Sequence, residues 1–369
     1  MMSASESISV PSRSNRKVEK GRIPKADYTV RHCWNRARYG RMPRMYAPHR
    51  CLGAARSRFG HGTWLGLLLL TAPAAAQSTL TPVATLPLTA AVVHADGPLG
   101  VAGNGSTLTV LDLSDLTEPR VRGQLELTDR VWDVVVDGDR AYLANGFIGL
   151  VVVTLDDPDQ PQVAGSYEVV SQGQTVSVAM AGQLVLTTNN QTGLNVFDVS
   201  KPTMPVMLSE WLTGGYSRDV IGLPGLGLVA DQPDGLHVVG IDAPADPQET
   251  SIHFAEGETT QLVTVAPATR TAFIADGATA LVEIVNLTDV AAPARVGSYQ
   301  PAGRVVQLTA RDDLLYLAQG RGGLTVIDVA DPSHPFVVAS HSAPTRTVAL
   351  VDDIVLAAGA DTLTLFHVP

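Results

Sequence analysis

Short apolar runs of about six residues alternate with polar breaks along most of the chain. Between residues 304 and 341, four such runs follow one another, at 304–309, 314–318, 324–329 and 336–341. The runs are rich in β-branched residues, and Gly, Asp and Pro gather in the breaks, as is typical of strands joined by turns. No window keeps a 3.6-residue period with capping residues. The pattern therefore predicts four strands in this unit and almost no helix.

The third run of this unit recurs along the sequence. Its copies begin at Leu108, Leu150, Leu194, Leu236, Val282, Leu324 and Leu363, which are 42, 44, 42, 46, 42 and 39 residues apart. Seven residues beyond the position of Asp328, six copies carry a proline: Pro119, Pro161, Pro205, Pro247, Pro293 and Pro335. A fixed period of this length indicates a repeat architecture.

The third run is apolar on both faces, because Leu324 and Val326 point one way and Ile327 and Val329 the other. A strand buried on both faces must lie between two other layers. Repeated four-stranded sheets stacked around an axis describe a β-propeller. The last copy supplies three strands, and residues 80–88 resemble the start of a fourth. We therefore predict an all-β, seven-bladed propeller of four-stranded antiparallel blades, closed by an N-terminal strand that completes the last blade.

Segments 108–113, 194–199 and 324–329, each followed by a proline-containing loop, resemble the LVIVD repeats of bacterial and archaeal exported or surface proteins. The resemblance covers residues 80–369. It implies an extracytoplasmic β-propeller and assigns no activity. The chain departs from the pattern where Gly240, Asn286 and His367 replace the repeat aspartate.

The charge of the chain is divided unevenly. Residues 1–76 hold 14 of the 26 Lys and Arg and 3 of the 36 Asp and Glu, so the rest of the chain has a net charge of −21. Such an acidic surface repels nucleic acid, which we therefore exclude as a partner. Cys33 and Cys51 both precede residue 77, which excludes a disulfide framework or a thiolate metal site from the propeller.

Residues 64–76 form an apolar run preceded by Arg56 and Arg58 and ending in three alanines before Gln77. This is the layout of a bacterial signal peptide, and the run is shorter than the roughly 20 residues of a membrane span. We expect residues 45–76 to be a signal peptide cleaved after Ala76, leaving no stable membrane span. Residues 77–369 would then form a secreted, periplasmic or cell-surface propeller, expected to be a monomer. Residues 1–44 are expected to be disordered or to precede the true translation start, with a long basic pre-region as the alternative.

The repeat aspartates Asp112, Asp198 and Asp328 resemble a ring of carboxylates. Thr154, Asn286 and Gly240 take the same position without a charge, which a metal ring would tolerate poorly. An Asp at the end of a strand accepts backbone N–H groups from its own turn. We therefore interpret this position as a loop cap.

The first strand of each blade lines the axial channel of a propeller, so its polar residues are the candidate ligand-binding groups. Aligning these strands places Asp133, Ser177, Asp219, Thr264 and Gln307 in one layer. Three residues earlier, nearer a mouth of the channel, stand Arg130, Gln174, Tyr216, Gln261 and Arg304, with Trp132 and Arg218 beside the layer. Such a ring could bind a small polar ligand or ion, and a water-filled channel with polar walls is the structural alternative.

The remaining motifs are weak. The histidines after residue 77 do not pair at metal-ligand spacing, and 231–235 is a turn whose two carboxylates make a poor cation site. No nucleotide-binding or nucleophile-elbow fingerprint is present. We expect no cofactor and no metal site.

Two functional hypotheses follow. The favoured one is a non-enzymatic exported scaffold that binds an unknown protein, glycan or small ligand on one face. The alternative is a hydrolase or oxidoreductase acting in the channel, with Asp133 or Asp219 as base or metal ligand and Arg218 or Arg304 as an anion clamp. The alternative predicts a strongly shifted carboxylate pKa at the channel.

Overall fold

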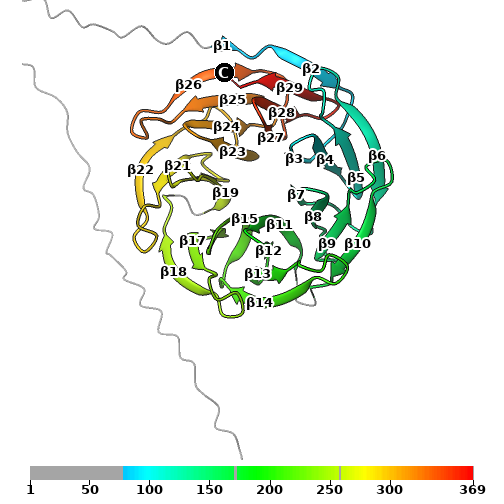
Figure 1. Cartoon of the computed structure of the whole chain (residues 1–369). Coiled ribbons are helices and arrows are strands. Elements are labelled where there is room, and N and C mark those ends of the chain that lie inside the picture. Colours follow the sequence, from blue (N-terminus) through cyan, green and yellow to red (C-terminus); the bar gives the residue numbers. More distant parts are fainter. Residues whose placement is uncertain (1–77, 170–172, 257–258, 369) are drawn as a thin grey trace, which may run out of the picture. The chain divides into compact units, whose positions relative to one another are not determined.

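A computed structural model describes residues 78–169, 173–256 and 259–368. These residues form 29 strands in seven sheets and no helix. The sheets are arranged radially as the blades of a ring (Figure 1). The predicted signal peptide at 45–76, the segment 1–44 and both cysteines lie outside the described residues.

The blades follow one another in chain order. Blade 1 contains β3 (Val92–Asp96), β4 (Leu99–Asn104), β5 (Thr107–Asp112) and β6 (Arg120–Glu126). Blade 2 contains β7 (Asp133–Asp137), β8 (Arg140–Ala144), β9 (Leu150–Thr154) and β10 (Gln162–Tyr167), and blade 3 contains β11 (Thr175–Ala181), β12 (Leu184–Asn189), β13 (Gly193–Asp198) and β14 (Val206–Leu212). Blade 4 contains β15 (Tyr216–Leu223), β16 (Leu226–Gln232), β17 (Gly235–Gly240) and β18 (Gln248–His253).

Blades 5 to 7 complete the ring. Blade 5 contains β19 (Thr260–Ala266), β20 (Thr271–Asp276), β21 (Val282–Asn286) and β22 (Ala294–Tyr299). Blade 6 contains β23 (Gln307–Arg311), β24 (Leu314–Ala318), β25 (Leu324–Asp328) and β26 (Phe336–His341). Blade 7 contains β27 (Thr347–Val351), β28 (Ile354–Ala358), β29 (Leu363–His367) and β2 (Pro82–Leu86). The four strands predicted between residues 304 and 341 are thus present, and the first of them begins three residues later than expected.

The ring is closed by the segment expected to close it. β2 pairs antiparallel with β29, with Leu86 opposite Leu363, so the first and last parts of the described chain share blade 7. The innermost strand β27 of blade 7 in turn packs against β3 of blade 1. The prediction of seven four-stranded antiparallel blades closed by an N-terminal strand is confirmed.

One strand was not anticipated. β1 (Ser78–Thr79) runs parallel to β26 and adds a fifth strand to the outer edge of blade 6. The amide of Leu80 continues the pairing by donating to the carbonyl of Ser340, and the Leu80 side chain is buried against blades 6 and 7. Residues 78–80 therefore contact both blade 6 and blade 7 before β2 joins blade 7.

The core lies between the blades. Seven clusters of buried apolar side chains each join two adjacent sheets; in one, Leu111 and Leu113 of blade 1 pack with Leu356 and Leu365 of blade 7. The third strands are buried on both faces, as predicted from their continuous apolar pattern. Burying apolar area in this way is the main stabilising contribution to the ring.

The repeat position ends the third strand of every blade, and in blades 1, 2, 3, 5 and 6 its side chain caps the following turn. Side-chain oxygens of Asp112, Asp198, Asn286 and Asp328 accept the backbone N–H two residues on, at 2.7–3.0 Å, and Thr154 does so at 3.4 Å. The interpretation of this position as a loop cap is confirmed. The repeat prolines stand immediately before the fourth strands β6, β10, β14, β18, β22 and β26.

In blades 1 to 5 the outer strand also docks against the loop before the fourth strand of the next blade. In blade 3, Ser209 Oγ donates to the carbonyl of Pro244 in blade 4 at 2.6 Å. In blade 5, Gly297 takes the same place in its strand, and a Cβ there would collide with the carbonyl of Pro332 in blade 6. Glycine at this place lets the two backbones approach directly.

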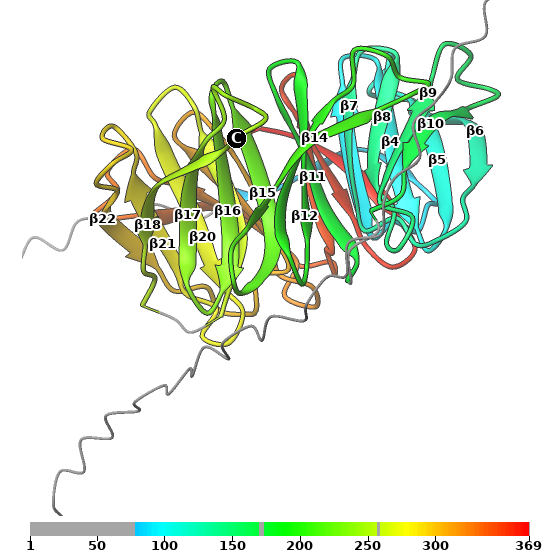
Figure 2. The same cartoon turned by 90° about the horizontal axis from the view of Figure 1, so that it is seen from below.

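The strands of each blade span the ring from one face to the other, with connecting loops at both faces (Figure 2). Because neighbouring strands are antiparallel, the start of each first strand, the second turn and the end of each fourth strand share one face. We call this the entry face. Along the described part of the chain, no helix is long and apolar enough to span a bilayer.

Candidate functional site at the axial channel

The innermost strands of the seven blades enclose an axial cavity of about 590 Å³. β3, β7, β11, β15, β19, β23 and β27 all contribute to its wall, and each packs against the first strand of the next blade. Polar side chains of these strands line the cavity, which brings groups from different blades together.

Three of the predicted residues form one hydrogen-bonded cluster. Ser177 Oγ lies 2.9 Å from Asp133 Oδ2 and 2.8 Å from Asp219 Oδ1. A serine hydroxyl carries a single proton, so it cannot donate to two ionised carboxylates at once. One carboxyl must therefore be protonated and donate to Ser177, while the hydroxyl donates to the other.

The environment of the two carboxyls assigns this proton to Asp133. Burial, together with the nearby Asp219 carboxylate, raises the pKa of Asp133 to about 7. Burial raises the pKa of Asp219 to about 6. Each carboxyl accepts two backbone amides, Asp133 those of Val134 and Val178 and Asp219 those of Val220 and Val263, so these bonds do not separate the two groups. The Asp219 charge, which raises the pKa of Asp133 further, places the proton on Asp133. The geometry and the pKa order thus give one chain, from the Asp133 acid through the Ser177 hydroxyl to the Asp219 carboxylate.

Side chains of this layer also tie one blade to the next. Asp133 accepts the amide of Val178 at 3.0 Å, as Asp219 accepts that of Val263. Gln307 Oε1 accepts the amide of Val348 at 2.9 Å, and Thr347 Oγ1 accepts that of Val93 at 3.3 Å. Side chains of the layer therefore form hydrogen bonds to backbone amides of the next blade. The oxygens that accept these bonds are the ones that a ligand would need.

The predicted layer is correct for four of its five residues. Asp133, Ser177, Asp219 and Gln307 all face the equivalent position of their second strands: Ala144, Thr188, Ala230 and Ala318. In blade 5 the residue in this register is Leu262, opposite Ala275, and Thr264 lies two residues further along, opposite Phe273. Thr264 still lines the cavity, but the alignment that put it in the layer was wrong, because an apolar side chain occupies the place in that blade.

The three predicted arginines lie at the entry face. Arg218 lines the cavity, and its Nε donates to Gln232 at 3.4 Å. Arg304 donates to Gln261 at 3.0 Å, and Arg130 stacks over the Trp132 ring at 4.3 Å from its centroid. In the part of the chain that the structure describes, none of them forms a salt bridge with the carboxylates of the layer.

The entry face also carries exposed aromatic side chains. Trp132 precedes β7, Phe147 lies in the turn between β8 and β9, Tyr216 begins β15 and Phe254 follows β18; all four are exposed. Leu212 and Val306 are exposed on the same face, at the end of β14 and just before β23. Of the large apolar side chains exposed on the opposite face, Phe336 alone is aromatic among the described residues.

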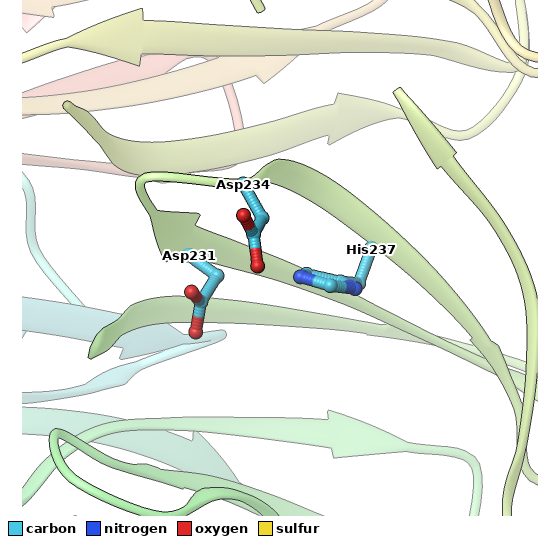
Figure 3. Close-up of side chains that lie close together, drawn as sticks. All are labelled: Asp231, Asp234 and His237. Carbon is cyan, nitrogen blue, oxygen red and sulfur yellow. The ribbon is translucent and has the colours of Figure 1, made fainter. Parts of the chain in front are cut away.

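A second cluster was missed by the sequence analysis. Asp231, near the end of β16, and Asp234, in the turn between β16 and β17, lie beside His237 of β17, and one ligand atom from each falls within 4.8 Å of the others (Figure 3). The sequence showed the two carboxylates but not the histidine, which stands at an apolar position of the repeat. A polar residue at a buried repeat position was the available signal.

Comparison with known proteins supports the repeat and the fold. The LVIVD repeat model matches residues 130–169, 172–213 and 302–342, which correspond to blades 2, 3 and 6. No curated protein matches the chain. Among many solved chains with a related structure, one from "Crystal Structure of Mitotic Checkpoint Complex" has a TM-score of 0.64 and 11% sequence identity, over 79% of this chain and 97% of that one. At this identity the likeness shows the fold alone.

Proposed function

We propose that this chain, a seven-bladed β-propeller built from LVIVD repeats, is an exported, non-enzymatic scaffold that binds a protein partner on its entry face. The observation that carries the proposal is the set of exposed aromatic side chains on that face, Trp132, Phe147, Tyr216 and Phe254. Aromatic residues and arginine are enriched where protein interfaces concentrate their binding energy. Leaving several large aromatic side chains exposed on one face costs solubility without a partner to cover them.

Charge supports the same face. The propeller is strongly acidic overall, whereas Arg218 lines the cavity and Arg130 and Arg304 stand just before the first strands β7 and β23 on the entry face. Arg130 is already stacked on Trp132, which holds a cation and a large apolar surface in one place. A partner with acidic and apolar side chains would complement this face.

Export is proposed from the sequence. The apolar run at 64–76, its basic flank and its alanine end are those of a cleaved signal peptide. N-terminal sequencing of the protein recovered from outside the cytoplasm is expected to give Gln77 as the first residue. A mature start well before residue 70 would contradict export through this signal.

The raised pKa of Asp133 favours a second candidate, acid–base chemistry by a hydrolase in the channel, because a carboxyl that titrates near neutrality suits proton transfer. The hydrogen bonds weigh against it, since both Asp133 oxygens accept backbone amides, from Val134 and Val178. Turnover of any substrate that is lost in Asp133→Asn would favour the second candidate over the scaffold.

The proposed scaffold role is tested by isolating a binding partner with the purified protein. The purified propeller is immobilised and exposed to a cell-envelope extract of the source organism, and the affinity of the protein retained is then measured in purified form. A double variant, Trp132→Ala with Tyr216→Ala, is compared with the control Phe336→Ala, which removes an exposed aromatic ring from the opposite face. We expect one partner that the wild type and the control bind alike and that the double variant binds at least tenfold more weakly. Equal loss in the control, or no specific retention by the wild type, would contradict the proposal.

A further inference from the structure

Where β16 turns into β17, an aspartate and a histidine are buried and carry side-chain atoms without hydrogen-bond partners in the described part of the chain. Blade 3 has unpartnered amide groups at the same two positions, Asn189 and Asn195, but those side chains are neutral amides, whereas blade 4 has a carboxylate and an imidazole. His237 is 1% exposed, and neither of its ring nitrogens has a hydrogen-bond partner among the described residues. Asp231 is fully buried; Ser217 donates to its Oδ2 at 2.7 Å, and its Oδ1 has no partner within the same residues. Unpaired groups of this kind cost free energy unless something else binds them.

The neighbouring blade provides an internal comparison. Asp276 holds the place of Asp231 in blade 5, and both its oxygens are bonded, Oδ1 to the amide of Ala278 at 2.9 Å and Oδ2 to that of Thr259 at 3.0 Å. Glu283 holds the place of His237, and its Oε2 lies 3.0 Å from His253 Nε2. The same positions are therefore satisfied within the protein in blade 5 and left open in blade 4.

The open atoms of blade 4 converge. One ligand atom from each of Asp231, Asp234 and His237 lies within 4.8 Å of the others. Figure 3 shows the far end of the imidazole ring directed at the Asp234 carboxylate, with Asp231 beside it. Asp234 is half-buried, so the cluster can be reached from solvent.

A further carboxylate lies behind the ring. Glu249 Oε1 on β18 is 3.5 Å from His237 Nδ1, which leaves Nε2 as the nitrogen that faces the two aspartates. Metal-binding histidines commonly direct their other ring nitrogen at a carboxylate, which fixes the tautomer and raises the basicity of the ligand. Trp211 packs edge-on against the same ring, with centroids 5.4 Å apart, and limits its rotation.

From these contacts we propose that Asp231, Asp234 and His237 bind a divalent transition-metal ion of the zinc class. Imidazole favours Zn²⁺ and its neighbours over Ca²⁺ and Mg²⁺, and carboxylates complete such sites. Zn²⁺ bonded at roughly 2.1 Å keeps its ligand atoms roughly 3–4 Å apart, so a small inward rotation of Asp234 completes the set. Three protein ligands leave a fourth position for water or for a donor group of a second molecule.

The site is tested on the purified propeller after treatment with a chelator. Zn²⁺ binding is followed by isothermal titration and by metal content after dialysis, and we expect one ion per chain and a rise in the melting temperature. Asp234→Asn changes a half-buried turn residue and keeps the buried side chains, and it is expected to weaken Zn²⁺ binding at least tenfold. Asp361→Asn, in the corresponding turn of blade 7, is the matched control and should bind as the wild type does.

Two further measurements distinguish ligation from a general attraction of cations to an acidic protein. Glu249→Gln should weaken Zn²⁺ binding roughly tenfold, through the orientation of His237. Bound Co²⁺ should show d–d absorption that His237→Gln abolishes. The proposal is overturned if the wild type retains no Zn²⁺, if Asp234→Asn binds Zn²⁺ as tightly as Asp361→Asn, or if Ca²⁺ and Mg²⁺ bind as tightly as Zn²⁺. None of these outcomes depends on whether the entry face binds a partner.

Discussion

The shared proton between Asp133 and Asp219 predicts that the propeller loses stability as the pH rises toward neutrality. In the unfolded chain Asp133 ionises near its ordinary pKa of 3.8, whereas in the folded protein burial and Asp219 raise its pKa to about 7. Between these values the folded state holds a proton that the unfolded state has released. Raising the pH therefore lowers the free energy of unfolding, by about 1.4 kcal/mol for each pH unit in this window.

The effect is isolated by comparison with Asp133→Asn, which keeps the side-chain size and removes the titrating group. Between pH 5 and pH 7, the free energy of unfolding of the wild type should fall relative to that of the variant by about 3 kcal/mol, as an upper limit. Burial lowers the pKa of His94 to about 4, so His94 acts in the opposite sense below pH 6.5. That contribution is present in both proteins and cancels in the difference.

The assay is urea unfolding of both proteins at pH 5, 6, 7 and 8, with the free energies extrapolated to water. We expect the free energy of unfolding of the wild type, minus that of Asp133→Asn, to fall steadily up to about pH 7 and to stay level above it. A difference that stays constant, or that widens in favour of the wild type as the pH rises, would show that Asp133 is already ionised at pH 5. The proton chain through Ser177 would then be wrong.

Three further predictions concern the ring itself. Asp328→Ala removes a loop cap and should lower the free energy of unfolding by about 1 kcal/mol, measured by urea unfolding; unaltered stability would contradict the capping role. Gly297→Ala places a Cβ against the carbonyl of Pro332 and should cost about 1–3 kcal/mol, whereas Gly240→Ala meets only ordinary contacts and should cost less; equal losses would refute the close approach of the blades. Leu80→Ala leaves a cavity beneath the strand that closes the ring and should cost about 2–5 kcal/mol, measured by thermal unfolding, with no loss if β1 does not anchor the ring.

The fold could be predicted because every blade repeats the same arrangement of strands and turns. A strand such as β25, buried on both faces, needs an unbroken apolar run, and a capped turn with a proline follows it, so the pattern is visible in the sequence. β1 could not be predicted. Its two residues pair through backbone groups and are both exposed, so no side-chain pattern marks them.

The candidate site was only partly predictable. The polar layer of the channel follows from aligning first strands, but in blade 5 the apolar Leu262 stands at the layer position, and an alignment by polarity then selects Thr264 two residues further on. His237 was missed for a different reason. The spacing of candidate ligands along the sequence does not show that the side chain of His237, on β17, lies beside Asp231 and Asp234, which precede that strand.

The central claim, that the entry face binds a protein partner, is tested most directly by photo-crosslinking in the living cell. A photoreactive phenylalanine analogue is placed at Tyr216 on the entry face and, in a second strain, at Phe336 on the opposite face; both positions are exposed. The account predicts a discrete crosslinked adduct with one other protein from position 216 and none from position 336. Adducts from position 336 alone, or no adduct from position 216, would contradict it.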